Sequence, residues 1–293
     1  MIAAQIAEFA SNESLPPAFI DMALQWYYPL AQEIADRVKT KEIKIIGVSG
    51  TQGSGKSTLA NLLQHLLNAQ NLTVVSLSLD DFYLTRAERQ QLAQSIHPLL
   101  ITRGVPGTHD IELANNTIKN LIANKNSNVP IPRFDKANDD RFPNTQWDNI
   151  TAPVDLIIFE GWCLGVPPQT ESALEQPVNI LEQDEDADGT WRHFVNNALI
   201  AYQDFFKQID YLIYLQSPDF GAVKRWRGRQ EEKLAAKTKT GSGTKIMDET
   251  ALNRFLQHYQ RLTEHGFKTL PNIANVIFTL NNEQQITQRL NRG

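Results

Sequence analysis

The stretch of sequence that decides the fold is Gly50-Thr51-Gln52-Gly53-Ser54-Gly55-Lys56-Ser57-Thr58, which fits the phosphate-binding pattern G-x-x-x-x-G-K-[ST]. An apolar, β-branched run at 43–48 precedes it and predicts a buried strand, and residues 59–67 place apolar side chains at helical spacing. Strand, glycine-rich turn and helix are the context that this motif requires. We therefore expect the chain to bind a nucleoside triphosphate.

The residue types within this loop suit phosphate binding. Gly50, Gly53 and Gly55 can adopt backbone angles that other residues rarely take, so successive N–H groups can turn toward phosphate oxygens. The following helix directs its positive N-terminal end at the same anion. We expect Lys56 to reach the β- and γ-phosphates and the Ser57 hydroxyl to ligate Mg²⁺. The predicted ATP site comprises all of 50–58, with Thr51, Gln52, Ser54 and Thr58 included.

Composition excludes several classes of protein. The 293 residues are 41% hydrophobic and 21% charged, as in a soluble globular protein, and no apolar run approaches the roughly 20 residues of a membrane span. The N-terminus lacks the basic and apolar regions of a secretion signal, and the single cysteine, Cys163, suits a reducing compartment. A net charge of −5 argues against a nucleic-acid binder. We expect a cytoplasmic protein with one domain, 1–293. Its expected partner is a small-molecule acceptor substrate, and neither a membrane nor a nucleic acid. The sequence does not determine its oligomeric state.

Hydrophobic periodicity predicts an alternation of strands and helices. Residues 17–40 are predicted to be helical and to pack across a sheet, as part of an N-terminal extension at 1–40. The proline-rich residues 129–143 are predicted to be a surface loop, and the acidic residues 182–188 an exposed, solvated insertion. The five predicted strands are 43–48, 72–79, 154–161, 211–215 and 275–280, and the main later helices are 111–123, 190–207 and 248–265.

Two adjacent carboxylates, Asp80 and Asp81, end the second predicted strand. Ligands of α/β proteins bind at the carboxyl ends of strands, so these residues are candidates for an acceptor site together with Tyr83. One of the two could instead cap the helix that follows, a role that Thr85 could also fill. We favour Asp80 as the group that accepts the proton of an acceptor hydroxyl or holds the Mg²⁺ shell. The choice of base between the two aspartates stays open.

A second strong signal lies at 154–161, where an apolar run ends in Glu160. An acidic residue at the tip of such a strand, downstream of a phosphate loop, gives the Walker-B pattern. The glutamate can orient a Mg²⁺-bound water or the acceptor. We therefore add Glu160 to Ser57 and Asp80 as candidate metal ligands.

Two further segments carry candidate acceptor-binding residues. At 103–110, Arg103 could bind a carboxylate or phosphate and His109 could donate a hydrogen bond, whereas Asp110 could serve the acceptor or cap the next helix. At 133–141, Arg133, Lys136 and Arg141 would form a cationic rim for an anionic substrate, or would be scattered surface charges.

The segment at 220–246 is predicted to be a lid. A helix there carries Lys224-Arg225-Trp226-Arg227-Gly228-Arg229, and such a lid would supply arginines to a transferring phosphoryl group. The Gly-, Ser- and Thr-rich stretch at 237–245 would be its hinge.

Together these residues resemble a known group of enzymes. The phosphate loop, the sequences S-L-D-D-F-Y-L and I-I-F-E-G, and the basic lid helix are similar to those of P-loop kinases related to uridine kinase, phosphoribulokinase and pantothenate kinase. Within that group, the chain resembles the plant-type D-glycerate 3-kinase family and its bacterial and fungal relatives. The resemblance covers residues 40–280, and the segments that carry it are 104–110, 132–136, 159–165 and 202–226.

The resemblance implies an α/β, three-layer P-loop kinase fold with a five-stranded parallel sheet in the order 2-3-1-4-5 and a helical lid. It implies ATP- and Mg²⁺-dependent transfer of a phosphoryl group to a hydroxyl. By motif position, Asp80 takes the role of the base, Glu160 the acidic role after the third strand, and Arg225 and Arg229 the lid role. Arg103, Arg133 and Lys136 become candidates for the acceptor's carboxylate.

The acceptor implied first is D-glycerate, with pantothenate or a nucleoside as alternatives. A P-loop NTPase that acts as a switch or assembly factor is a hypothesis of a different class. The arginine-rich helix and the D-D-F-Y acid favour transfer, since a switch needs neither. The sequence determines the identity of the substrate less well than the type of reaction, because the chain departs from the family in its acidic insertion and its long lid loop.

Overall fold

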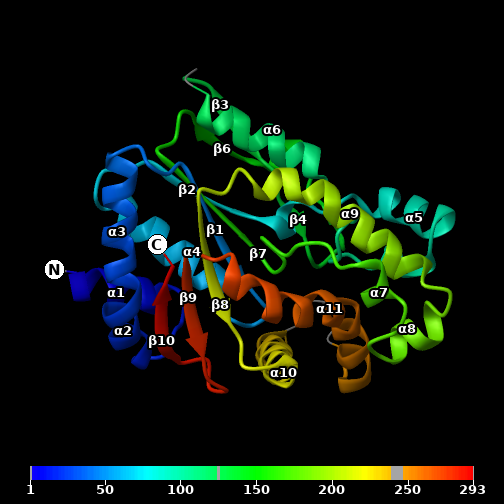
Figure 1. The fold of residues 1–293 in the computed structure, drawn as a ribbon. Coiled ribbons are helices and arrows are strands. Elements are labelled where there is room, and N and C mark those ends of the chain that lie inside the picture. The colour runs from blue at the N-terminus through cyan, green and yellow to red at the C-terminus, as the bar shows by residue number, and fades with distance from the viewer. Residues whose placement is uncertain (1, 124–125, 239–246, 293) are drawn as a thin grey trace.

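A twisted six-stranded sheet forms the centre of the computed structural model, which describes residues 2–123, 126–238 and 247–292 (Figure 1). Five of its strands are parallel and lie side by side in the expected order 2-3-1-4-5. They are β2 (Val74–Ser78), β7 (Leu156–Gly161), β1 (Ile45–Gly50), β8 (Tyr211–Gln216) and β9 (Val276–Leu280).

The expectation of five strands is nevertheless wrong by one. A sixth strand, β10 (Ile286–Asn291), pairs antiparallel with β9 at the edge of the sheet. Only Ile286 of this strand is buried, so β10 has no apolar run by which the sequence could identify it. Pairing with β9 holds it in the sheet.

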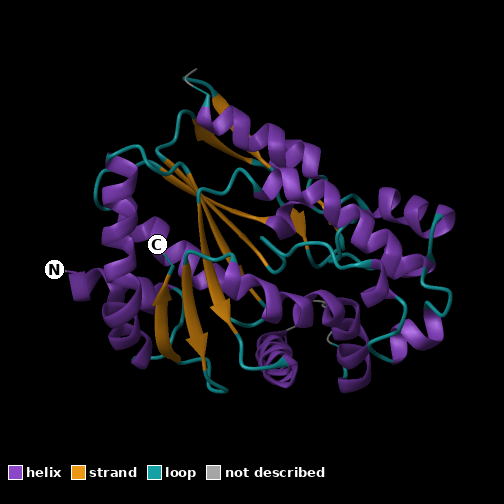
Figure 2. Cartoon of the chain, in the orientation of Figure 1, coloured by secondary structure: helices purple, strands orange, loops and turns teal. Residues whose placement is uncertain are grey.

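Helices cover both faces of the sheet and produce the predicted three layers (Figure 2). One apolar core joins the sheet to the N-terminal helices and to the helix after the phosphate loop. The other joins its opposite face to three later helices. The first set is α1 (Ile2–Asn12), α2 (Ala18–Met22), a π-helical turn (Ala23–Tyr27), α3 (Tyr28–Lys39) and α4 (Lys56–Asn68); the second is α6 (Ile111–Ile122), α9 (Thr190–Phe206) and α11 (Glu249–Thr269).

Strand register brings the chemically active positions together. Glu160 of β7 pairs with Val48 of β1 on one side and with Ser78 of β2 on the other. Because parallel strands share their direction, the phosphate loop after β1, the Asp80–Asp81 pair after β2 and Glu160 all lie at the carboxyl edge of the sheet.

Several shorter elements and the long helix α10 lie around the sheet. They are α5 (Arg86–Ser95), the β3–β6 pair (Asn128–Ile131 and Asp148–Thr151), the β4–β5 pair (Phe134–Asp135 and Asp140–Arg141), α7 (Glu171–Leu174), α8 (Ile180–Glu185) and α10 (Phe220–Thr238). The prediction that 129–143 is a simple surface loop is therefore wrong. Val129, Ile131 and Phe134 are buried, and the segment folds back over the Asp80 end of the sheet.

The prediction of a solvated acidic insertion at 182–188 is also wrong in part. Glu182 and Asp186 are buried, and each binds an arginine: Glu182 lies 2.6 Å from Arg261, and Asp186 lies 3.0 Å from Arg192. Arg261 belongs to α11, 79 positions from Glu182, whereas Arg192 lies in the first turn of α9, only six residues after Asp186. Buried carboxylates require such partners.

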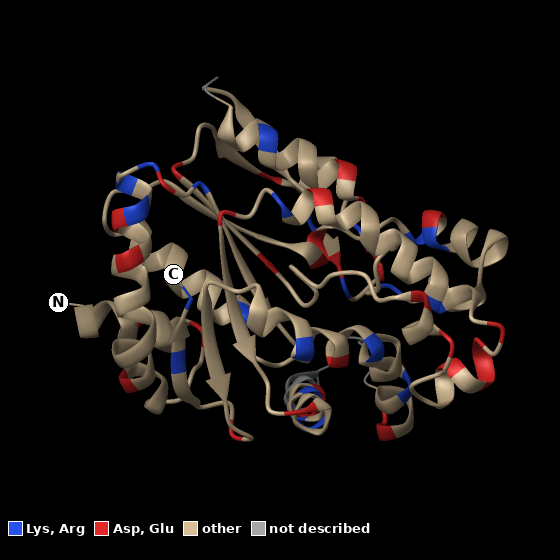
Figure 3. Ribbon diagram, in the orientation of Figure 1, with Lys and Arg blue, Asp and Glu red and all other residues tan. Residues whose placement is uncertain are grey.

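Other expectations concern charge and the lid. Figure 3 shows acidic and basic residues distributed over helices of both layers. No helix within the described ranges is long and apolar enough to cross a membrane. The predicted lid at 220–246 begins with α10, but most of its proposed hinge at 237–245 lies outside the described residues, which exclude 239–246.

Candidate active site

The phosphate loop joins β1 to α4 through two glycines in the left-handed region. Gly53 has a φ of 77° and Gly55, which precedes the first turn of α4, a φ of 91°. Gly50 differs from the expectation, since it lies in extended β1 and is required for space rather than for its backbone angle. A Cβ there would lie 2.6 Å from Ser54 Oγ and 3.1 Å from Leu215 Cβ.

Elements distant in sequence brace the loop. A Cβ on Gly53 would lie 2.8 Å from the Cβ of Trp226 in α10, and Gln284, between β9 and β10, donates a hydrogen bond to the Gly53 carbonyl. Trp226 itself donates to the carbonyl of Asn282 in the same turn (2.8 Å). Helix α10 and the unpredicted edge hairpin therefore brace the loop from outside.

Glu160 connects the loop to the sheet. Its Oε1 accepts hydrogen bonds from Ser57 Oγ (2.7 Å) and Ser78 Oγ (2.9 Å). Its Oε2 lies 3.7 Å from Lys56 Nζ and is buried without a hydrogen-bond partner. A buried, unpartnered carboxylate oxygen beside a serine hydroxyl is the hard oxygen donor set that suits Mg²⁺. The predicted ligands Ser57, Glu160 and Asp80 line one hollow, so the residues present fit this ion.

Asp80 faces the open side of the loop. Its Oδ1 accepts from the Tyr83 hydroxyl (2.8 Å) and its Oδ2 from Lys136 Nζ (2.7 Å). Burial favours a higher pKa of the Asp80 carboxyl, but the charges of Lys136 and Lys56 outweigh it and hold that pKa below its usual range. The carboxyl is thus ionised and can accept a proton or a metal ligand bond.

Asp81 makes different contacts. It accepts hydrogen bonds from Arg133 (3.1 Å) and from the backbone N–H of Phe134 (3.2 Å), and burial raises its pKa. Neither aspartate caps the next helix, because Thr85 does so in a reciprocal capping box with Glu88. Asp81 ties the β4–β5 hairpin to the site and lines one of the two hollows at this edge of the sheet, whereas Asp80 lines both.

Two hollows meet at this edge of the sheet. One, of about 280 Å³, lies over the phosphate loop, and the other, of about 330 Å³, lies beside α4 and β2. Both are lined by Ser57, Asp80 and Lys136. The first, which we call the loop pocket, has charged walls of Lys56, Asp80, Arg103, Lys136 and Arg227 and aromatic walls of Tyr83, Trp162, Phe255 and Tyr259. Arg133 lines the second hollow.

His109 and Asp110 lie behind the loop pocket rather than in its wall. His109 Nδ1 and the Tyr202 hydroxyl are 2.8 Å apart, and the imidazole stacks on Tyr83 with ring centroids 4.5 Å apart. Burial lowers the pKa of His109 to about 3, so the ring is neutral near pH 7. Asp110 caps α6 by accepting from the Leu113 N–H (2.9 Å). His109 and Asp110 therefore support Tyr83 and the residues around it on the side away from the loop pocket.

The lid arginines divide between two faces of α10. Arg225 and Arg229 are exposed and line a separate groove, where Arg225 donates to the Asn282 side chain (2.6 Å). Arg227, between them, lines the loop pocket. At about 100° per residue, side chains two positions apart face nearly opposite directions. The buried Val223, four residues before Arg227, is the sequence signal that could have identified the inward face.

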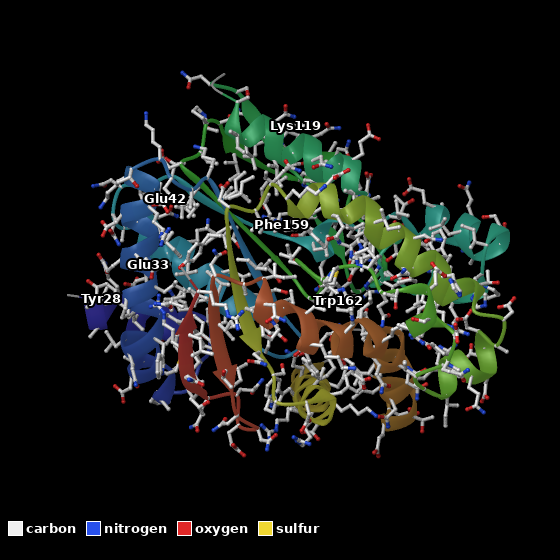
Figure 4. The ribbon with its side chains drawn as sticks, viewed as in Figure 1. Tyr28, Glu33, Glu42, Lys119, Phe159 and Trp162 are labelled. Carbon is white, nitrogen blue, oxygen red and sulfur yellow. The ribbon has the colours of Figure 1, made fainter. Side chains whose placement is uncertain are left out.

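Aromatic residues that sequence reasoning missed hold Arg103 in place. Trp162, just beyond β7 (Figure 4), donates to the Gly104 carbonyl (2.9 Å), and the Tyr259 hydroxyl donates to the Arg103 carbonyl (3.0 Å). Gly104 has a φ of 136°, and a Cβ there would lie 2.0 Å from the Tyr259 hydroxyl oxygen. Only glycine fits at this position, so Gly104 is the one residue in the local sequence that could have indicated this close packing.

Comparison with known proteins places the chain among kinases. Residues 45–178 match the model of the phosphoribulokinase/uridine kinase family. An uncharacterized kinase of Schizosaccharomyces pombe, mug58, is 37% identical over 223 residues, which cover 73% of this chain and 78% of that protein. The chloroplastic D-glycerate 3-kinase of Arabidopsis thaliana is 31% identical over 73% of this chain, but the match spans only 46% of that enzyme.

A solved structure shows the same fold. The D-glycerate 3-kinase of Cryptococcus neoformans var. grubii superimposes with a TM-score of 0.72, covering 90% of this chain and 99% of that one. The two sequences are 24% identical. At that distance the likeness concerns the arrangement of strands and helices.

Proposed function

The chain belongs to the phosphoribulokinase/uridine kinase family, and we propose that its acceptor is a hydroxyl of a small organic anion, D-glycerate in the first place. The observation that carries this proposal is the set of cations that line the loop pocket. Lys56, Arg103, Lys136 and Arg227 line a hollow of about 280 Å³ together with one carboxylate, Asp80, while Glu160, Asp139 and Glu231 pair with three of these cations from outside its lining. The N–H donors that these pairs leave free can bind an anion, whereas a neutral nucleoside does not require cationic donors. The resemblance to D-glycerate 3-kinases supports the choice of acid.

Each residue at this edge has a place in phosphoryl transfer. The amides of the phosphate loop and Lys56 bind the β- and γ-phosphates. Asp80, held by Tyr83 and Lys136, accepts the proton of the attacking hydroxyl, and Arg227 reaches over the transferred group to neutralise its oxygens. Ser57, Glu160 and Asp80 would hold Mg²⁺, which neutralises charge on the phosphates when bound. Arg103, which also lines the loop pocket, would bind the acceptor's carboxylate as a bidentate donor.

In this proposal, Arg227 neutralises the transferred phosphoryl group, a role that the sequence had suggested for Arg225 and Arg229. It also assigns the base to Asp80 and a structural role to Asp81. These assignments follow from which side chains line the loop pocket. Arg133, which lines the second hollow and binds Asp81, lies at the rim.

The test is ATP consumption in the presence of a panel of acceptors: D-glycerate, L-glycerate, glycerol, pantothenate and uridine. We expect strong stimulation by D-glycerate, a phosphorylated product detectable by ³¹P NMR, and weak or no stimulation by neutral glycerol and uridine. Stimulation by pantothenate alone would keep the kinase and replace the acid. A slow rate that no acceptor changes would contradict the proposal and favour an NTP-dependent switch.

A further inference from the structure

The β4–β5 hairpin, together with Arg133 and the residues up to Arg141, is fastened to the active site by ion pairs. Two of them, from Arg133 and Lys136 to the aspartate pair, contact the proposed base and its neighbour. A third connection runs through Asp139, in the turn between β4 and β5, and has no part in the chemistry described above.

Asp139 is the counter-ion of a fully buried arginine. Arg89 in α5 is 0% exposed and donates to the carbonyls of Leu84 (3.2 Å), Ile101 (2.7 Å) and Asp139 (2.6 Å). Its Nη1 also lies 3.2 Å from Asp139 Oδ2. A buried guanidinium is costly without a paired charge, so this interaction fixes the Asp139 carboxylate in one place.

The second oxygen of the same carboxylate binds a pocket residue. Asp139 Oδ1 accepts a hydrogen bond from Nη1 of Arg103, whose backbone is already held by Tyr259. The Arg103 guanidinium also lies over the Phe134 ring, 5.3 Å from its centroid. A guanidinium has five N–H donors, so those that do not bind Asp139 remain for a ligand in the loop pocket. Arg103 is thereby oriented before any acceptor arrives.

Asp139 adopts a backbone conformation that serves this geometry. Its φ of 57° lies in the left-handed region, which aspartate tolerates better than most residues. In that conformation both its carbonyl and its carboxylate reach Arg89, while one carboxylate oxygen is left for Arg103. The three side chains together carry one net positive charge, which matches one carboxylate.

We propose that Asp139 is a positioning and specificity-determining residue, which holds Arg103 in the orientation that binds a monoanionic acceptor. This inference rests on the proposed function, because it concerns the acceptor of that reaction. Binding a carboxylate to a preoriented guanidinium avoids the ordering cost that a free arginine side chain would bear. Acceptor affinity therefore depends on a residue that does not touch the acceptor.

The experiment compares Asp139→Asn with Asp140→Asn in steady-state kinetics. Asp140 is the matched control, because it lies next in the same hairpin and accepts from the backbone N–H groups of Arg86 and Arg141. We expect Asp139→Asn to raise the KM for D-glycerate about tenfold, with kcat and the KM for ATP nearly unchanged. Asp140→Asn is expected to leave all three unchanged. Arg103→Met should raise the same KM, and the double variant should add nothing further.

The contrary outcomes are distinct. If Arg103→Met raises the KM for D-glycerate while a folded Asp139→Asn protein does not, Arg103 needs no positioning and the inference fails while the proposed function stands. If the wild-type protein phosphorylates no anionic acceptor, both fail. Thermal unfolding midpoints establish that the variants are folded. Should Asp139→Asn unfold, Asp139→Glu keeps the charge beside Arg89 but displaces the carboxylate by one methylene, and the same rise in KM is expected.

Discussion

The phosphate side and the acceptor side of the loop pocket are built in different ways. The phosphate side is one continuous segment, 50–58, whose backbone supplies most of the binding groups and whose shape depends on glycines. The acceptor side is assembled from side chains of the turn after β2, the 103–110 segment, the β4–β5 hairpin and α10, held by ion pairs. The first side can bind the common part of every nucleoside triphosphate, and the second can vary with the acceptor.

This comparison predicts the largest effect for the acceptor-side base. Asp80→Asn removes the proton acceptor but keeps its shape, so kcat should fall about 10³-fold, within the range for general-base catalysis. The KM for ATP should change little, because the backbone of 50–58 is untouched. The matched control is Asp81→Asn, whose partners are Arg133 and the Phe134 N–H.

We expect the control to lower stability rather than kcat, since Asp81 fastens the hairpin. Both variants would be measured by steady-state kinetics with ATP and D-glycerate and by thermal unfolding. An equal loss of kcat in the two variants would mean that the aspartates act together and that the assignment of Asp80 alone is wrong.

The next effect in size concerns α10. Arg227→Ala should lower kcat about 10²-fold if this cation neutralises the transferring phosphoryl group. Arg229→Ala, two residues along on the exposed face, should change kcat less than about twofold, as is usual for exposed charges far from the reaction. Single-turnover rates with saturating ATP would compare the two. The opposite ranking would restore the lid role to the residues first inferred from the sequence.

Much of the phosphate side could be predicted from sequence because its geometry is local. The G-x-x-x-x-G-K-[ST] spacing dictates a turn between a strand and a helix, and the apolar run before Glu160 dictates a neighbouring strand. The bracing of Gly53 by Trp226 and Gln284 could not be predicted, since it depends on contacts across more than 170 positions and on a strand, β10, that has no apolar run of its own.

The acceptor side was predictable in residue type but not in geometry. Arg103 and Lys136 were identified as basic residues near a substrate, yet nothing in their local sequence predicted that Asp139 and Asp80 would bind them. The same limit explains Glu182, whose partner Arg261 lies 79 positions away, whereas Arg192 lies only six residues from Asp186 and its pairing was missed because the acidic run was interpreted as solvated. Charge pairs between distant segments leave no periodic pattern in a single sequence.

A smaller effect tests the phosphate side directly. Gly53→Ala places a Cβ 2.8 Å from Trp226 at a φ of 77°, and left-handed strain of about 1–2 kcal/mol that shifts the loop should raise the Kd for an ATP analogue about tenfold. Gly189→Ala is the control, since Gly189 also precedes a helix with a φ of 80° but lies before α9. Isothermal titration with a non-hydrolysable ATP analogue would measure both. Equal affinities would show that the loop adapts to a side chain.

The smallest effect concerns Lys136, which faces both hollows. The charges of Lys136 and Lys56 outweigh the effect of burial and hold the pKa of Asp80 below its usual range, while the Tyr83 hydroxyl also donates to the carboxylate. Lys136→Met removes one of these charges, so the pKa of Asp80 should rise. The base acts only when ionised, and protonation increases as pH falls through its pKa. Activity of the variant should therefore decline at higher pH than that of the wild type.

The size of this shift follows from one opposite charge at contact distance. A displacement of about one to three pH units in the acidic limb of kcat/KM is expected, with little change near pH 7, where the carboxyl is ionised in both proteins. Lys119→Met is the control, because Lys119 lies on α6 away from the loop pocket (Figure 4). Profiles from pH 2 to 8, read only where each protein is shown to be folded, would measure the limb. An unchanged limb would mean that Lys136 leaves Asp80 when acceptor binds, so that the ion pair belongs to the free protein alone.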